Sequence, residues 1–305
     1  MIKAITVTTY LGDSIKLELT RPELSGFAVG SISGLGPSKA DINTTEVATN
    51  DGGTFNSARL NQRNIVMDLV FVDTIAKESI EDIRHKSYKY FPVKKKVRLQ
   101  IETDNRISEI EGYVEHNEPV IFTKREGCQI SIICPQPHLY SVNEKGVTVF
   151  SGIEPSFSFP FSNESLTEDL LNMGSILRKS QHVVVYNGDA DVGVTITINA
   201  IGEASHVSIH NVGKREVMRI DTDKLAAITG SGIIDKDEIV INTTKGNKSI
   251  TLLRDGKTTN ILNCLSKDAD WFQLSKGDNI FAYTAETGSL NLLFKIENRI
   301  IYEGV

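Results

Sequence analysis

The sequence predicts a mainly β protein made of two units, a β-rich unit that contains one helix followed by an all-β sandwich or jelly roll. Three observations support this class. Apolar residues recur with a period of two over most of the chain, Gly, Asn and Asp clusters separate the runs, and one segment alone has convincing helical spacing. An α/β fold is disfavoured because strands and long helices do not alternate.

The strand signal is the alternation of apolar and polar side chains, which is typical of half-buried antiparallel strands. Turn signals lie between the runs, since Gly, Asn and Asp tolerate positive φ and suit hairpin turns. The clearest alternating runs are 15–19, 97–102, 128–132, 194–199 and 290–296, and the clearest turn clusters are 50–53, 187–189, 245–247 and 255–256.

A helix is expected over about residues 73–91, because its apolar residues are spaced at three to seven positions. Asp73 or Thr74 is the expected N-cap, and Pro92 ends the helix because its ring disfavours a helical conformation of the preceding residue. A weaker helix is predicted over 167–173. The apolar positions of the main helix are Ala76, Ile80, Ile83 and Tyr90.

The best candidate for a domain boundary follows the segment 134–140, which contains two prolines directly after a predicted strand. We therefore expect a first domain over 1–141 and a second over 142–305. The second domain has many short strands with a turn signal about every ten residues, which is typical of sandwiches and jelly rolls.

Composition narrows the functional classes. The 305 residues include 33 Lys and Arg against 39 Asp and Glu, a formal net charge of −6, which argues against a generally basic nucleic-acid binder. With 40% hydrophobic and 24% charged residues the chain fits a globular protein. We expect neither a signal peptide nor membrane insertion, because the N-terminus lacks an apolar h-region and no run approaches 18 apolar residues.

Motifs for catalysis or cofactor binding are missing from the sequence. It has no dinucleotide or P-loop glycine pattern and no Gly-x-Ser-x-Gly elbow. His206 and His210 lie on one face of a predicted strand about 13 Å apart, too far to share a metal unaided. Cys128, Cys134 and Cys264 are expected to be buried free thiols. We therefore predict no enzyme activity, no cofactor and no metal.

The polar stretch 36–63 is the most unusual segment, because connections of this length in compact domains are generally functional, disordered or protruding hairpins. One interpretation is a surface loop without a partner. The other is an arm that reaches a neighbouring subunit, with Arg59 and Arg63 in inter-subunit pairs. The candidate interface residues are Thr45, Thr54, Phe55, Arg59, Asn61 and Arg63.

Trp271 is the only tryptophan and precedes a turn at 276–279. The favoured interpretation is a core anchor of the second domain. The alternative is a platform on which a glycan or partner stacks, as exposed aromatic residues do in β-sandwich lectins.

The ordered set of segments resembles the distal tail protein family of phages with long tails, also called Dit, and the related siphovirus-type tail components. The resemblance covers nearly the whole chain. It is carried in the first domain by 64–71, 90–92, 110–115 and 134–140, and in the second by 157–161, 186–189, 198–202, 271–279 and 302–305.

This resemblance implies a structural protein of a virion tail tip, baseplate or tail-like particle, assembled in the host cytoplasm. It implies a β-sandwich or split-barrel domain that builds a hexameric ring, and a galectin-like second domain that serves as a docking platform. The expected partners are further copies of the chain, the tail tube protein, the tail hub or tail-associated protein, the tape measure protein, and receptor-binding or peripheral baseplate proteins. DNA only passes through the channel.

Two other functional classes remain open from the residues. The second sandwich could make the chain a carbohydrate-binding protein that acts in adhesion to the host surface, with Trp271 in the site. A β-rich hydrolase with an unmarked pair of carboxylates is the third hypothesis, since the many Asp and Glu residues give no particular pair. Oligomeric state, glycan binding and turnover of cell-wall polymer separate the three.

Overall fold

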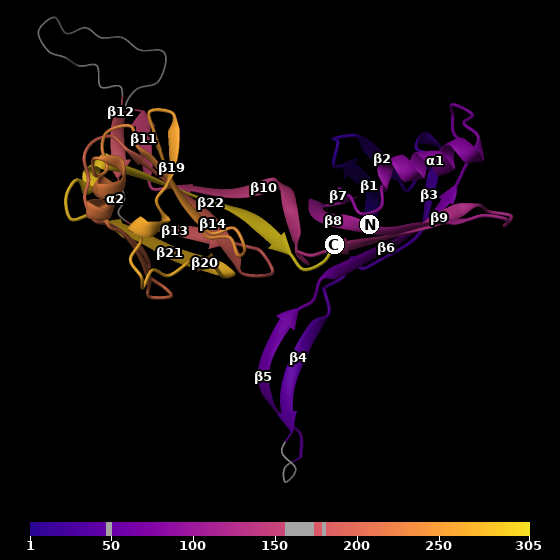
Figure 1. The fold of residues 1–305 in the computed structure, drawn as a ribbon, viewed down its shortest axis with the longest axis horizontal. Coiled ribbons are helices and arrows are strands. Elements are labelled where there is room, and N and C mark those ends of the chain that lie inside the picture. Colours follow the sequence, from indigo (N-terminus) through magenta and orange to yellow (C-terminus); the bar gives the residue numbers. More distant parts are fainter. Residues whose placement is uncertain (47–50, 156–173, 179–180) are drawn as a thin grey trace, which may run out of the picture. The chain divides into compact units, whose positions relative to one another are not determined.

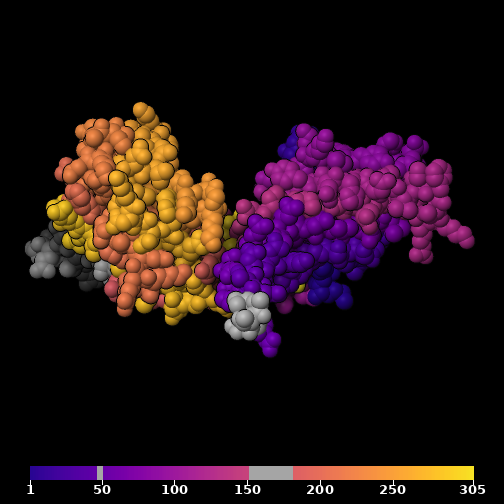
Figure 2. Space-filling model, turned by 60° about the horizontal axis from the view of Figure 1, so that its bottom comes forward, coloured from indigo at the N-terminus to yellow at the C-terminus, as the bar shows by residue number. Residues whose placement is uncertain are grey.

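The computed structural model describes residues 1–46, 51–155, 174–178 and 181–305, and it confirms the mainly β class. The chain divides into two compact units. Unit 1 comprises Met1–Glu144 with Ile301–Val305, and unit 2 comprises Lys145–Ile300. In Figure 2 most of unit 1 is indigo to magenta and most of unit 2 is orange to yellow, while residues 301–305 of unit 1 have the yellow of the C-terminus. The division lies close to the boundary expected from the two prolines, but unit 1 also contains a segment that follows unit 2 in the chain.

Unit 1 is an antiparallel sheet whose strands are ordered β2-β1-β7-β8-β9-β6-β3, with β10 paired to the start of β8. Alternate side chains of these strands fill one core, as the period of two predicted. A separate hairpin of β4 and β5 leaves the body of the unit (Figure 1). The strands are β1 (Ile2–Thr9), β2 (Ser14–Glu18), β3 (Phe27–Ser33), β4 (Ala40–Glu46), β5 (Gly53–Leu60), β6 (Arg63–Phe71), β7 (Lys96–Thr103), β8 (Ile107–Val120), β9 (Gly127–Cys134) and β10 (Leu139–Val149), with a 3-10 turn η1 at Pro22–Leu24.

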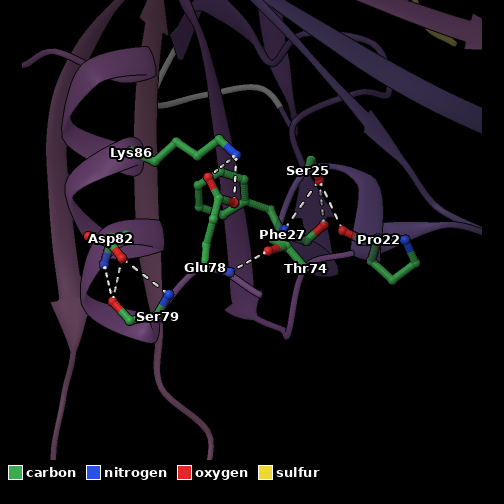
Figure 3. Close-up of polar contacts among 8 residues, drawn as sticks. All are labelled: Pro22, Ser25, Phe27, Thr74, Glu78, Ser79, Asp82 and Lys86. Carbon is green, nitrogen blue, oxygen red and sulfur yellow. Dashed lines mark hydrogen bonds and ion pairs between the residues drawn. The ribbon is translucent and has the colours of Figure 1, made fainter. Parts of the chain in front are cut away.

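The helix α1 (Ile80–Tyr90) packs on β1, β6, β8 and β9 through the buried Ile83. It begins at Ile80, so the expected start near residue 73 and the expected cap by Asp73 or Thr74 are wrong. Ser79 is the N-cap, and it forms a capping box with Asp82 in which each side chain accepts a bond from the other's backbone N–H (Figure 3). Lys77, at φ +55°, interrupts the helical path before it. The predicted stop before Pro92 is confirmed.

Unit 2 contains two antiparallel sheets of the predicted sandwich, ordered β19-β18-β17-β14-β22 and β13-β21-β15-β16. Two further pairings are β20 with β14 and β11 with β12. The strands are β11 (Ser151–Pro155), β12 (Gly174–Arg178), β13 (Gln181–Tyr186), β14 (Val192–Ala200), β15 (Val207–Asn211), β16 (Glu216–Ile220), β17 (Glu238–Asn242), β18 (Ser249–Arg254), β19 (Lys257–Asn260), β20 (Gln273–Leu274), β21 (Gly277–Thr284) and β22 (Leu292–Tyr302), with 3-10 turns η2 (Leu262–Cys264) and η3 (Ser289–Asn291).

Aromatic side chains from both sheets meet in the core of unit 2. Tyr283 of β21 stacks on Phe294 of β22 with 3.9 Å between ring centroids, and Phe281 meets Phe272 edge-to-face at 5.6 Å. Such pairs add to the free energy gained by burying the rings. The interlocked rings fix the spacing of the two sheets.

A second helix, α2 (Thr222–Thr229), was not predicted from the sequence. Asp221 caps it by accepting from the backbone N–H groups of Asp223 and Lys224, and Gly230 ends it in the left-handed conformation. Its eight residues are too few for a clear periodic signal. The weaker predicted helix at 167–173 lies outside the described residues. Among the residues described here, no helix has the length and apolar character needed to cross a membrane.

One buried ion pair ties the loop after α2 to β18. The Arg254 guanidinium donates to both oxygens of Asp237, at 2.7 and 2.6 Å, and Asp237 is 1% exposed. The remaining guanidinium donors reach Thr229, Ser231 and Gly232. All of these bonds lie within unit 2. Arg254 therefore adds a side-chain tie between the loop and β18 to the main-chain bonds that join Lys236 and Asp237 to Ala200 of β14.

We expect Asp237→Asn to destabilise the protein by about 3–5 kcal/mol, because it leaves the Arg254 charge without its buried partner. Urea unfolding followed by circular dichroism measures the change. The matched control is Asp268→Asn, which removes a 3.5 Å pair with Arg219 at an exposed position and should change stability by less than about 1 kcal/mol. Equal effects of the two substitutions would refute this account of the pair.

Candidate assembly surface

The hairpin of β4 and β5, which we call the arm, is an amphipathic ribbon. Its register pairs Ala40 with Leu60, Ile42 with Ala58 and Thr44 with Phe55 on one face. Ile42 is 65% exposed and Phe55 63% exposed, so this face presents an apolar surface to solvent. Large exposed apolar patches mark interaction sites. Within the part of the chain that the structure describes, no element covers this face.

The opposite face of the arm is polar and bonded across the strands. Asn43 donates to Ser57 at 3.0 Å, Asn56 donates to Thr45 at 2.6 Å, and Arg59 pairs with Asp41 at 3.5 Å. A bulge at Asn43 and Thr44 keeps both faces in register by leaving Asn56 unpaired in the ladder. The cross-strand bonds hold the ribbon together while its apolar face stays open.

The structure brings together five of the six predicted interface residues on the arm or at its end. Thr45 and Thr54 form a cross-strand pair on the polar face, and Phe55 lies on the apolar face. Arg59 is 78% exposed, and Asn61 donates from its side chain to Asp41 at 2.8 Å. Sequence reasoning missed Ile42, Ala58 and Leu60 because the stretch looked polar overall. A period of two over 40–42 and 58–60 points to them, whereas the bulge at Asn56 breaks this period before Phe55.

Arg63, the sixth predicted residue, lies at the base of the arm and is only 3% exposed. Its guanidinium donates to four main-chain carbonyls of its own chain, those of Gly34, Gly36, Pro137 and Glu303. Burial lowers the pKa of Arg63 from its usual value. The geometry makes Arg63 a residue that positions the arm rather than an open charge for a neighbour.

A tight turn also shapes the arm base. Gly34 has φ +83°, and a Cβ at this position would lie 2.0 Å from the carbonyl oxygen of Asn64. Only glycine allows this backbone conformation together with so close an approach. The chain can therefore turn out of β3 into the arm directly beside the start of β6.

Trp271 of unit 2 is half-buried and lines an open hollow of about 530 Å³. The neighbouring Phe272 is fully buried, so Phe272 provides the aromatic core anchor at this position. The Lys248 ammonium lies 5.1 Å from the centroid of the indole ring. The hollow also involves Lys224, Leu262, Leu265 and Lys267.

A group with metal-binding residue types lies at the start of α2, where His206, Asp221 and Asp223 have ligand atoms within 4.8 Å of one another. The sequence analysis missed it because the residues are not at a local ligand spacing. Asp221 already caps the helix and pairs with Lys224 at 3.1 Å, while His206 lies 3.1 Å from Glu286. These contacts give the group a capping and ion-pairing role.

The three cysteines are buried free thiols, as predicted. Burial raises the pKa of Cys128 to about 12 and that of Cys134 to about 11, and it also raises the pKa of Cys264. The thiolate is the reactive form of cysteine, so these thiols are inert at neutral pH. They act as small apolar side chains of the two cores.

One comparison with known proteins concerns part of unit 2. Residues 187–297 match the family model described as siphovirus-type tail component, C-terminal domain. The predicted resemblance to siphovirus-type tail components is confirmed over these residues. A search of curated proteins found no match.

Solved structures extend the similarity over the whole chain. The Dit protein (gp 19.1) of SPP1, described as a paradigm of the hub adsorption apparatus in phages that infect Gram-positive bacteria, aligns with a TM-score of 0.65 at 13% identity over 98% of this chain and 99% of that one. A chain of the phage P2 baseplate, in its activated conformation with Ca, aligns with a TM-score of 0.52 at 11% identity over the full length of both. The chain therefore has the Dit fold.

We expect a thiol reagent such as Ellman's to label none of the three cysteines within minutes in the folded protein at pH 8. With a pKa of about 12, only about 10⁻⁴ of the Cys128 side chains are thiolates at that pH. All three should react after unfolding in guanidinium. Rapid labelling of any of them in the native state would contradict the assigned burial.

Proposed function

We propose that the chain is a non-enzymatic distal tail protein that forms a hexameric ring between the tail tube and the tail hub. The single observation that carries this proposal is the arm, whose exposed apolar face needs a partner surface. The Dit fold over the whole chain supports the same role. We propose that six copies close into the ring because a repeated heterologous contact generates a ring when its rotation closes.

In this proposal the apolar face of the arm packs on a neighbouring copy. A two-stranded hairpin is only marginally stable alone, so an arm of this length gains stability from a surface that covers it. Burying a side chain such as Ile42 or Phe55 contributes about 1.5–3 kcal/mol, and a closed ring repeats this contact at every interface. Thr45, Thr54, Arg59 and Asn61, on or beside the polar face, then line the edge of the contact.

Unit 2 is proposed as the docking platform, with peripheral baseplate or receptor-binding proteins as its partners. The tail tube protein lies on one side of the ring, the hub or tail-associated protein on the other, and the tape measure protein and DNA pass along the channel. The protein is then located at the tail tip or baseplate after assembly in the host cytoplasm. The family match over residues 187–297 supports this placement of unit 2.

A second candidate function is glycan binding at Trp271. The observation that favours it is the open hollow beside a half-buried indole ring, since aromatic faces stack on sugar rings. The two functions are compatible, because a platform domain can also bind a glycan on the host surface.

We expect Ile42→Ser combined with Phe55→Ser to abolish ring formation and leave the fold intact, because both side chains are exposed in the single chain. Mass photometry should show a species of about 200 kDa for the unaltered protein, six times the 33.6 kDa chain, and only the single chain for the variant. Deleting residues 42–60 should have the same effect.

The matched control is Leu290→Ser, an apolar side chain of unit 2 that is 62% exposed. It should leave the ring unchanged. Rings of normal mass from the double variant or from the deletion would exclude the arm as the assembly contact.

Because Trp271 is the only tryptophan, its emission reports on the hollow alone. If the site binds glycan, titration with cell-wall saccharides should change the emission saturably, and Lys248→Met should alter the binding constant by removing the cation from the ring. A flat titration across the saccharides would leave the structural role as the function of unit 2.

A further inference from the structure

The base of the arm is held by a clamp that we define as Arg63, Arg106 and the segment 302–305. Arg63 is placed at the junction where the arm returns to β6. It donates at 2.8 and 2.6 Å to the carbonyls of Gly34 and Gly36, which precede the arm, and at 2.7 Å to the carbonyl of Glu303. Both ends of the arm are thus fastened to a segment from the far end of the chain.

The segment 302–305 makes further contacts in the same place. The Val305 N–H donates to the Leu35 carbonyl at 3.1 Å, and Arg106 donates to the Gly304 carbonyl at 2.9 Å. The Arg106 guanidinium also lies 4.2 Å from the centroid of the Tyr302 ring. Gly304 lies directly against the arm base, since a Cβ there would meet the Leu35 carbonyl oxygen at 3.3 Å.

The strands of the arm make few contacts that would fix the direction in which the arm leaves unit 1. Every residue of β5 is exposed, and beyond the β4–β5 ladder the Asn61 N–H donates to the Lys39 carbonyl at the base, at 3.0 Å. Arg63 is buried, and a buried guanidinium with an unsatisfied N–H group is costly. The arm base therefore reaches its lowest free energy only when all the carbonyl acceptors of Arg63 are in place.

The order of these acceptors along the chain has a consequence for assembly. Of the four carbonyls that accept from Arg63, those of Gly34, Gly36 and Pro137 precede unit 2, whereas that of Glu303 follows it. A chain under synthesis can therefore fold the strands of unit 1 up to residue 144 but lacks the last acceptor of Arg63. The clamp closes only after the whole of unit 2 has been made and the chain has returned to unit 1.

We propose that this clamp is an assembly checkpoint, which holds the arm ready for a neighbouring copy only in chains whose segment 302–305 has docked on unit 1. The inference rests on the proposed function, since it takes the arm to be the contact between copies. It assigns Arg63 as a positioning residue, which acts through the arm rather than by touching the neighbour.

The test uses the full chain with Arg63→Gln, which removes the charge and most of the donors, and with Val305→Pro, which removes the N–H that bonds to Leu35 and leaves Arg63 unchanged. Hydrogen exchange of peptides covering 34–46 and 53–62 should be at least about tenfold faster in Arg63→Gln and about fivefold faster in Val305→Pro. Mass photometry should show a parallel loss of rings. Val305→Pro keeps the proposal testable where Arg63→Gln fails to fold.

The matched control is Arg59→Gln, which makes the same change of charge on the exposed part of the arm. Its exchange rates at residues 34–39 should equal those of the unaltered protein. A merely structural role of Arg63 would lower the melting temperature without raising exchange selectively in the arm, and that result would overturn the proposal.

The outcomes also separate this inference from the proposed function. Faster exchange at the arm base with normal rings would overturn the checkpoint and leave the ring in place. If the unaltered protein forms no ring even with a tail hub protein present, the proposed function fails, whereas the exchange data still report whether the clamp exists. Unchanged exchange in both variants would overturn the clamp whatever the oligomeric state.

Discussion

A guanidinium buried in a protein needs acceptors for its N–H groups, and at Arg63 this requirement organises the first unit. The acceptors come from the turn before the arm, from Pro137 before β10 and from Glu303 after β22. These four main-chain carbonyls lie within reach of the guanidinium only if the segments that carry them follow the observed backbone path. The Arg63 side chain therefore links the arm base, the segment before β10 and the segment after β22, and Arg106 and the Val305–Leu35 bond add to the same junction.

The arm shows how a ribbon can be well defined and still incomplete. Its polar face carries cross-strand bonds from Asn43 to Ser57 and from Asn56 to Thr45, which fix the register. Its apolar face gains nothing from the chain's own described residues, although Phe55 and Ile42 are large side chains. The two faces thus differ: one holds the strands in pairing, and the other would provide the free energy of association in the proposed ring.

The sequence predicts the strands far better than the contacts between distant segments. Alternation identified β7, β9 and β14, because burial of one face needs only local spacing. The same rule also placed Leu19 and Leu290 on the buried faces of strands, whereas both side chains are exposed. The start of α1 was placed too early because apolar spacing continues before Ser79, whereas the capping box decides where the helix begins. The carbonyl partners of Arg63 have no sequence signal, since a main-chain acceptor is present at every residue.

Several residues of reactive types hold the fold. Cys128 and Cys134 are buried thiols with raised pKa values, Asp221 caps α2, and Asp237 neutralises Arg254. Groups committed in this way are poor candidates for chemistry, because releasing them would cost the interactions that place them. The exposed feature of unit 1 is instead the amphipathic arm, which is fixed at its base. An arm that is fixed at its base and apolar on one face suits the proposed joining of copies, and the clamp at its base then decides when the arm is in place for a neighbour.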